Sequence, residues 1–186
     1  MITISCDELS KKIENLYRID EKIKNAVAEA VNISAEEAKV KAILRVQETY
    51  DVKAEQNNIK VRGRDYAVRL FKARASTLTA YFGVNGRPIP LIRFNVTPTE
   101  PRKQKVIVSV KKSGGKSIDG AFIARLKSGH IGVFIRAGKS SLPIKQLYGP
   151  SVPQMFGEKS IVEYMEKEAK KILEDNVILE VNKVLD

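Results

Sequence analysis

The chain has 186 residues, of which 43% are hydrophobic and 30% are charged, and its formal net charge at pH 7 is +11. This length and apolar content suit one well-buried domain and exclude general disorder. One cysteine and one histidine exclude an internal disulfide and a His/Cys metal cluster. No stretch approaches the about 20 apolar residues of a membrane span, and the N-terminus has no apolar run of signal-peptide length. We therefore expect a protein that is cytosolic or assembled from the cytosol, without membrane contact.

The charge is unevenly distributed along the chain. Residues 1–56 carry nine Lys/Arg against eleven Asp/Glu, residues 57–157 carry nineteen against three, and residues 158–186 carry five against eight. The three segments therefore have net charges of −2, +16 and −3. An excess of this size repels itself unless a polyanion or an acidic partner lies against it, so nucleic acid is the first partner to consider. A solvated basic surface is the alternative that charge alone leaves open.

Residues 5–55 have the three- and four-residue apolar spacing of amphipathic helices, and their opposite face is strongly charged. The spacing of a capping box occurs twice, at Ser5 with Glu8 and at Ser34 with Glu37. The segment is therefore predicted to be N-terminal helix, either as two helices or as one that continues through Asn32.

The period changes to that of β-strands from Tyr66 onward. Asn85-Gly86 lies between two β-rich runs and predicts a hairpin. Gly114-Gly115 lies between two further runs and predicts a tight reversal with positive φ angles at the glycines, and Ser128-Gly129 predicts another reversal. Because these connections are too short for parallel crossovers, residues 66–136 are predicted to form a mainly antiparallel meander.

Residues 137–156 contain Pro143, Pro150 and Pro153, which predict an ordered extended loop rather than a regular helix or a central strand. The apolar side chains of this loop are too numerous to leave in water. We expect them to pack under the domain, which is the favoured interpretation, or against another chain.

Residues 157–185 return to helical spacing, with Glu158 in the first turn, where a carboxylate is favoured by the helix dipole. A long C-terminal helix is predicted. The predicted fold class is α+β, a mainly antiparallel sheet flanked by N-terminal helices and this C-terminal helix, in a single domain spanning residues 1–186.

Two Gly-Lys-Ser tripeptides, at 115–117 and 138–140, raise the possibility of a phosphate-binding loop. That loop needs a glycine five positions before its second glycine, and the two sequences have Val110 and Val133 there. The segments that follow carry glycine or prolines and lack the helical period that the loop requires. A nucleotide loop is therefore rejected; Lys116 is predicted to flank a hairpin, and Lys139 to end a strand.

Enzymatic chemistry has no positive support in the sequence. Nothing suggests that Cys6, near a predicted helix start, meets His130, in a predicted strand or turn. The three acids of the basic segment, Asp65, Glu100 and Asp119, lie apart in sequence, and ion pairing is their favoured role. A carboxylate-only metal site stays open. We predict no catalytic residue and no cofactor.

The basic residues of the central segment lie on predicted strands and loops, where they would contact phosphates without reading bases. One group precedes the first hairpin and comprises Lys60, Arg62, Arg64, Arg69, Lys72 and Arg74. The other group is predicted to contact a DNA path or an acidic partner and comprises Arg102, Lys103, Lys105, Lys111, Lys112 and Lys116.

Several short stretches occur in a distinctive order before the final helix: "GRPIPLIRF", Gly120-Ala121-Phe122-Ile123, Lys127-Ser128-Gly129, Pro143-Ile144 and Leu147-Tyr148-Gly149-Pro150-Ser151-Val152-Pro153. In these stretches, and in the order of its helices, the chain resembles the minor tail protein Z family of tailed bacteriophages and prophages. The resemblance covers most of the chain and rests on pattern, because no catalytic motif is involved.

This resemblance implies a non-enzymatic structural protein of the virion tail, assembled in the host cytoplasm and acting in tail completion and in joining of tail to head. It implies an oligomeric ring around the DNA path, with other tail or connector proteins as partners and no cofactor. Contacts between subunits are expected at Leu147, Tyr148, Val152, Met155 and Phe156. The alternative is a sequence-independent nucleic-acid-binding protein that uses the basic central segment.

Overall fold

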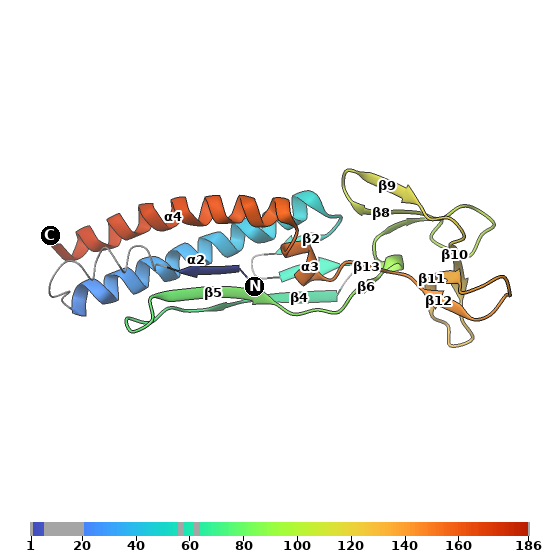
Figure 1. The fold of residues 1–186 in the computed structure, drawn as a ribbon, viewed down its shortest axis with the longest axis horizontal. Coiled ribbons are helices and arrows are strands. Elements are labelled where there is room, and N and C mark those ends of the chain that lie inside the picture. The colour runs from blue at the N-terminus through green and yellow to red at the C-terminus, as the bar shows by residue number, and fades with distance from the viewer. Residues whose placement is uncertain (1, 6–20, 56–57, 62–63, 186) are drawn as a thin grey trace.

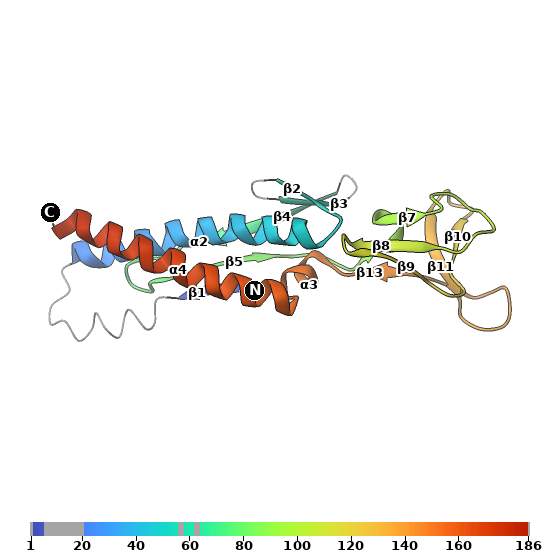
Figure 2. The same cartoon turned by 90° about the horizontal axis from the view of Figure 1, so that it is seen from above.

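The computed structural model describes residues 2–5, 21–55, 58–61 and 64–185. Two long helices, α2 (Glu21–Thr49) and α4 (Lys159–Leu185), lie side by side and antiparallel along most of the molecule. A group of short strands extends beyond one end of this pair, so the molecule is elongated (Figure 1). Seen from above, α4 crosses over α2 obliquely (Figure 2).

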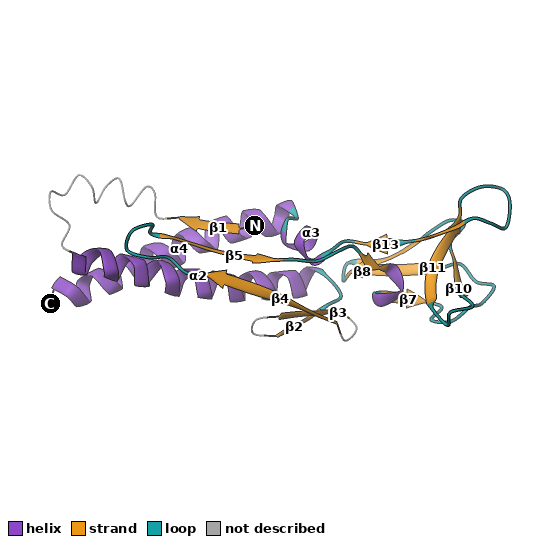
Figure 3. Cartoon of the chain, turned by 90° about the horizontal axis from the view of Figure 1, so that it is seen from below, coloured by secondary structure: helices purple, strands orange, loops and turns teal. Residues whose placement is uncertain are grey.

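Among the described residues, an antiparallel five-stranded sheet with the order β1-β5-β4-β3-β2 lies under the helices. Its strands are β1 (Ile2–Ser5), β2 (Lys53–Glu55), β3 (Asn58–Val61), β4 (Arg64–Phe71) and β5 (Thr79–Val84). Burial alternates along β4 and β5, because one face packs on the helices while the other faces away from them (Figure 3). We call these strands, together with α2, α4 and the short α3 (Val152–Phe156), the helical lobe.

Residues 85–150 form the part that extends beyond the helices, which we call the distal lobe. It contains β6 (Ile89–Pro90), a 3-10 turn at Leu91–Arg93, β7 (Asn95–Thr97), β8 (Ile107–Lys111), β9 (Gly114–Ser117), β10 (Phe122–Arg125), β11 (Ile131–Arg136), β12 (Ile144–Gln146) and β13 (Tyr148–Gly149). These strands make two small sheets, β7-β8-β9 and β10-β11-β12, while β6 pairs with β13 where the lobe meets the rest of the molecule.

One contiguous cluster of buried side chains runs through both lobes. In the helical lobe, α2 contributes small side chains such as Ala35 and Ala38, and α4 contributes Met165, all fully buried. In the distal lobe the cluster centres on Phe94, which is 1% exposed. Gly149 is required beside this ring, since a Cβ there would lie 2.6 Å from the Phe94 Cε2 atom.

The predicted α+β class, the antiparallel pairing and the long C-terminal helix are confirmed. The open question at Asn32 is also answered, because α2 continues through it as one helix. The alternative with two helices, the second of them beginning at Ser34, is thereby excluded: this residue lies inside α2, where its hydroxyl donates to the Ala30 carbonyl at 2.7 Å. The other predicted start, Ser5, is the last residue of β1, and the helical pattern of residues 6–20 lies outside the described residues.

The prediction of a hairpin at Asn85-Gly86 is wrong. Both neighbours of β5 are already present, as β1 and β4, and the chain continues from Asn85-Gly86 to β6. Pro88 and Pro90 follow the pair, and proline has no N–H for a regular ladder. The predicted helix also ends earlier than expected, at Thr49, and β2 occupies residues 53–55.

The reversal at Gly114-Gly115 is confirmed as the β8–β9 hairpin, with Gly114 at φ +138 and Gly115 inside β9. Positive φ is thus confirmed at the first glycine and not at the second. The third reversal is confirmed as well, between β10 and β11, with Gly129 at φ +82.

The proline-rich segment 137–156 is more regular than predicted, because it contains β12, β13 and the single-turn helix α3. Pro153 is tolerated in the first turn of α3, where its missing N–H would have no partner in the helix. Ser151 and Gln154 close a capping box around that turn.

Candidate partner-binding surface of the distal lobe

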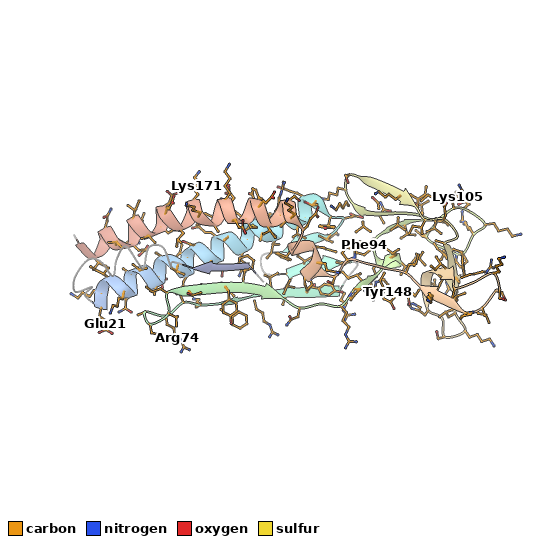
Figure 4. All side chains as sticks on the ribbon, viewed as in Figure 1. Glu21, Arg74, Phe94, Lys105, Tyr148 and Lys171 are labelled. Atoms are coloured by element: carbon orange, nitrogen blue, oxygen red, sulfur yellow. The ribbon has the colours of Figure 1, made fainter. Side chains whose placement is uncertain are left out.

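The net charge of the chain is concentrated on the distal lobe. Residues 85–150 carry thirteen Lys/Arg against two Asp/Glu, a net +11, while the rest of the chain carries twenty against twenty. The basic side chains extend outward over the lobe, as the labelled Lys105 illustrates (Figure 4). The distal lobe therefore carries the entire net positive charge of the protein, and the net charge of the remainder is zero.

Five of the six predicted contact residues are exposed on the sheet β7-β8-β9 or its connecting loop. Arg102, Lys103 and Lys105 lie in the loop between β7 and β8, Lys112 lies at the turn of the hairpin, and Lys116 lies on β9 opposite Val108. No described carboxylate forms an ion pair with any of these five. Their charges are therefore available to a partner.

Lys111, the sixth predicted contact, is engaged within the chain. Its ammonium forms an ion pair with Glu158 and lies 5.6 Å from the centre of the Tyr50 ring. Glu158 is the residue before α4 and not, as predicted, part of its first turn. These contacts turn the side chain toward the helical lobe. The sequence could not reveal this, because the three residues come from distant segments.

Sequence reasoning missed further basic residues on the same lobe. These are exposed side chains on the remaining strands and loops, namely Arg87, Arg125, Lys127, Arg136, Lys139 and Lys145. The local excess of basic over acidic residues in 85–150 was the signal that could have found them. Arg136 lies over the Phe122 ring at 5.6 Å. The prediction that Lys139 ends a strand is wrong, because β11 ends at Arg136 and Lys139 lies in the loop that follows.

The residues predicted to contact other subunits divide into two groups. Val152, Met155 and Phe156 are 0%, 0% and 6% exposed and belong to the core of this chain, so in this conformation they are not available to a second copy. Leu147 is partly buried against the same core. Tyr148 is 54% exposed, and its hydroxyl donates weakly to Gln146 Oε1 at 3.4 Å.

The remaining candidates for chemistry stay apart. His130 is exposed, and Cys6 lies outside the described residues. Lys116 flanks the hairpin as predicted. Asp65 pairs with Lys60 at 3.8 Å, as expected, whereas Glu100 and Asp119 are exposed and form no ion pair among the described residues.

Over the described part of the chain, no group of three or more His, Cys, Asp or Glu side chains is placed to hold a metal ion. Within the same residues, neither long helix has the apolar stretch needed to cross a bilayer.

An elongated α+β molecule that presents exposed cations on a projecting lobe has the features of a binding or assembly protein. The sequence model of the family described as Prophage minor tail protein Z matches residues 7–185, and the chain belongs to this family of phage tail proteins. No curated protein and no solved structure matches the chain.

Proposed function

We propose that this minor tail protein acts in tail completion and in joining of tail to head, as an oligomeric ring around the DNA path. The observation that carries the proposal is the concentration of the whole net charge, +11, on the distal lobe. In this arrangement the exposed cations of the distal lobe face the DNA backbone or an acidic neighbouring ring. The neutral helical lobe faces other copies, together with Tyr148, which lies on β13 where the two lobes meet. The role is structural, without catalysis or a cofactor.

The type of side chain supports a backbone contact. The exposed lysines and arginines lie on loops and on separate strands, rather than along one recognition helix that could enter a groove. Such a surface attracts phosphates through charge and does not depend on base sequence. This suits a passage through which DNA of any sequence moves.

The experiment is a deletion of the gene in a lysogen that carries it, followed by complementation and negative-stain electron microscopy of the induced lysate. The test variant is the triple substitution Lys103→Gln, Lys105→Gln, Lys116→Gln on the distal lobe. Its matched control is Lys167→Gln, Lys170→Gln, Lys171→Gln, which removes three exposed charges from α4.

We expect unjoined heads and tails, or joined particles that cannot infect, after deletion. The α4 control should restore joining, and the distal variant should not. Infectious particles of normal appearance after deletion would overturn the role in assembly. Equal failure of the two triple variants would show that the location of the charge does not matter.

Contact between copies is proposed at Tyr148, the most exposed of the predicted subunit-contact residues. A Tyr148→Ser variant should form fewer oligomers in mass photometry. If its oligomers equal those of the unmodified chain at the same concentration, the contact lies elsewhere on the surface.

A sequence-independent nucleic-acid-binding protein is the second candidate, because the same unpaired cations would serve it. It predicts normal particles after deletion and tight, salt-dependent binding of duplex DNA by the isolated chain. The deletion phenotype separates the two functions, whereas weak DNA binding would be shared by both.

A further inference from the structure

The turn of the β8–β9 hairpin reaches back from the distal lobe and contacts the C-terminal end of α2. The Lys112 N–H donates to the Thr49 carbonyl at 3.0 Å, and the Asp51 N–H donates to the Val110 carbonyl at 3.1 Å. Tyr50 and Lys111 are directly opposite each other in an isolated antiparallel bridge. The hairpin thereby supplies a donor to a helix end whose last carbonyls have no partner within the helix.

Side chains reinforce this backbone contact. The Tyr50 hydroxyl donates to Glu158 Oε2 at 2.6 Å, and the Lys111 ammonium pairs with Glu158 Oε1. Tyr50 is 5% exposed, so its hydroxyl would lose water without gaining a partner if Glu158 were absent. The three residues come from the end of α2, the end of β8 and the residue before α4.

The charges also suit the helix ends that meet here. The last turn of α2 has no basic residue, and Lys111 brings a positive charge near its negative end. Glu158 places a carboxylate at the positive end of α4, where its own carbonyl accepts the N–H groups of Ile161 and Val162. Hydrogen bonds from Lys111 and then Tyr50 hold the pKa of the Glu158 carboxyl below its ordinary value.

Without this contact, the distal lobe would be joined to the helical lobe through two chain crossings, at residues 85–88 and 150–151, and through the apolar cluster that the two lobes share. The strands next to these crossings, β6 and β13, pair over only two residues each. The ribbon formed by β6 and β13 is narrow enough to twist. The contact between the β8–β9 hairpin and α2 lies away from this ribbon and therefore restricts the direction of the distal lobe.

We propose that Tyr50, Lys111 and Glu158 form a latch that fixes the direction of the distal lobe relative to the helical lobe. Lys111 is thus a positioning residue and not a contact to the partner. One part of this inference rests on the proposed function: the purpose of the fixed direction, which is to aim the exposed cations at the DNA path or the acidic ring.

The latch is tested on the purified full chain by amide hydrogen exchange in a double-mutant cycle of Lys111→Met and Glu158→Gln. Loss of a charge-assisted contact should speed exchange at the Asp51 and Lys112 amides by roughly ten-fold in each single variant. The double variant should be no faster than the faster single variant, because either substitution already breaks the pair. Amides inside α2, such as that of Ile43, should keep their protection.

The matched control is Lys41→Met, which breaks the ion pair between Lys41 and Glu168 inside the helical lobe. It should leave exchange at Asp51 and Lys112 unchanged. Unchanged exchange in the single variants of the cycle would overturn the latch, as would effects that multiply in the double variant.

The direction of the distal lobe is measured separately, by the distance between two spin labels. The labels are attached to cysteines introduced at Lys105 and Lys171, after the native cysteine is removed by Cys6→Ser. These two positions lie on different lobes (Figure 4). The Lys111→Met variant should broaden the distance distribution, and Lys41→Met should not. An unbroadened distribution in Lys111→Met contradicts the latch, whereas failure of the proposed function would appear only in the particle assay.

Discussion

In the helical lobe, several Lys and Arg side chains form ion pairs with carboxylates, as in the pairs Lys41–Glu168, at 2.6 Å, and Arg45–Glu48, at 3.0 Å. In the distal lobe, Lys111 alone among the thirteen basic residues has an ion pair with a described carboxylate, and that carboxylate belongs to the helical lobe. Surface pairs of the first kind contribute little stability but cancel the local field. The difference indicates that the helical lobe is balanced within the chain, whereas the distal lobe is left to be balanced from outside.

The two lobes differ in charge but share one apolar core. The helical lobe buries long helices on a five-stranded sheet, while the described strands of the distal lobe form sheets of at most three short strands. Sheets this small need a shared apolar core to be stable. Because the buried cluster is continuous between the lobes, we expect them to unfold together.

The largest expected effect comes from breaking the core of the distal lobe with Phe94→Ala. Truncating a buried phenylalanine should lower the free energy of unfolding by about 3–5 kcal/mol. The measurement is thermal unfolding followed by circular dichroism of the helices, which lie in the other lobe. A lower midpoint for the helices would support a single cooperative domain over residues 1–186.

The control for this substitution is Leu142→Ala, since Leu142 is 70% exposed and should change the midpoint little. Unchanged helix unfolding in Phe94→Ala, with loss of amide protection confined to residues 89–149, would show two independent units.

The second prediction concerns charge. If the three lysines neutralised by Lys103→Gln, Lys105→Gln, Lys116→Gln each contact a phosphate, the slope of log affinity for duplex DNA against log salt should shrink by about 2.7. The α4 triple variant should leave that slope unchanged, because its lysines belong to the balanced lobe. Fluorescence anisotropy over a range of salt concentrations measures both, and equal losses would contradict a dedicated distal surface.

Local signals predicted the parts of this fold that local physics determines. Helical spacing predicted α4 and most of α2, and the reversal at Gly114 followed from the need for positive φ. The hairpin predicted at Asn85-Gly86 is absent because β5 already pairs with β1 and β4. Since β1 comes from the start of the chain, no local signal near Asn85 could reveal this pairing. Ser34 has the spacing of a capping box without starting a helix, because it lies inside α2, where its hydroxyl donates to the Ala30 carbonyl and accepts from Asn176 of α4.

The candidate partner-binding surface could also be predicted from the sequence only in part. Composition was enough to locate the basic surface, because net charge is a property of the sequence. It could not separate Lys111 from Lys112, which are adjacent in sequence but differ in whether Glu158 lies within reach. Nor could hydrophobicity tell that Met155 is buried in this chain's own core, since a core and an interface require the same type of side chain.

A smaller effect is expected at the contact between α2 and α4. Ser34 is fully buried, and its hydroxyl accepts a hydrogen bond from Asn176 Nδ2 at 3.2 Å. Ser34→Ala should lower the free energy of unfolding by about 1 kcal/mol in urea denaturation. The Asn176→Ala variant should cost a similar amount, and the double variant should cost less than the sum. Strict additivity would mean that the two side chains do not stabilise each other.

The smallest effect, a pH dependence, compares the latch with an ion pair of the helical lobe. Lys111 and Tyr50 lower the pKa of Glu158 below its ordinary 4.5, and Lys41 lowers that of Glu168 in the same direction. In each case the folded state binds the proton more weakly than the unfolded state, so the stabilisation is complete above about pH 4.5 and is lost as the pH falls through the folded pKa. Glu158→Gln and Glu168→Gln should therefore each reduce the urea midpoint at neutral pH and lose that effect as the pH falls below 4.5 and through the folded pKa of each glutamate. Tyr50 should make the two pairs differ, because it donates a second hydrogen bond to Glu158: adding Tyr50→Phe should reduce the acid dependence assigned to Glu158 and leave that of Glu168 unchanged. An equal reduction at both glutamates would indicate a general loss of stability rather than a local bond.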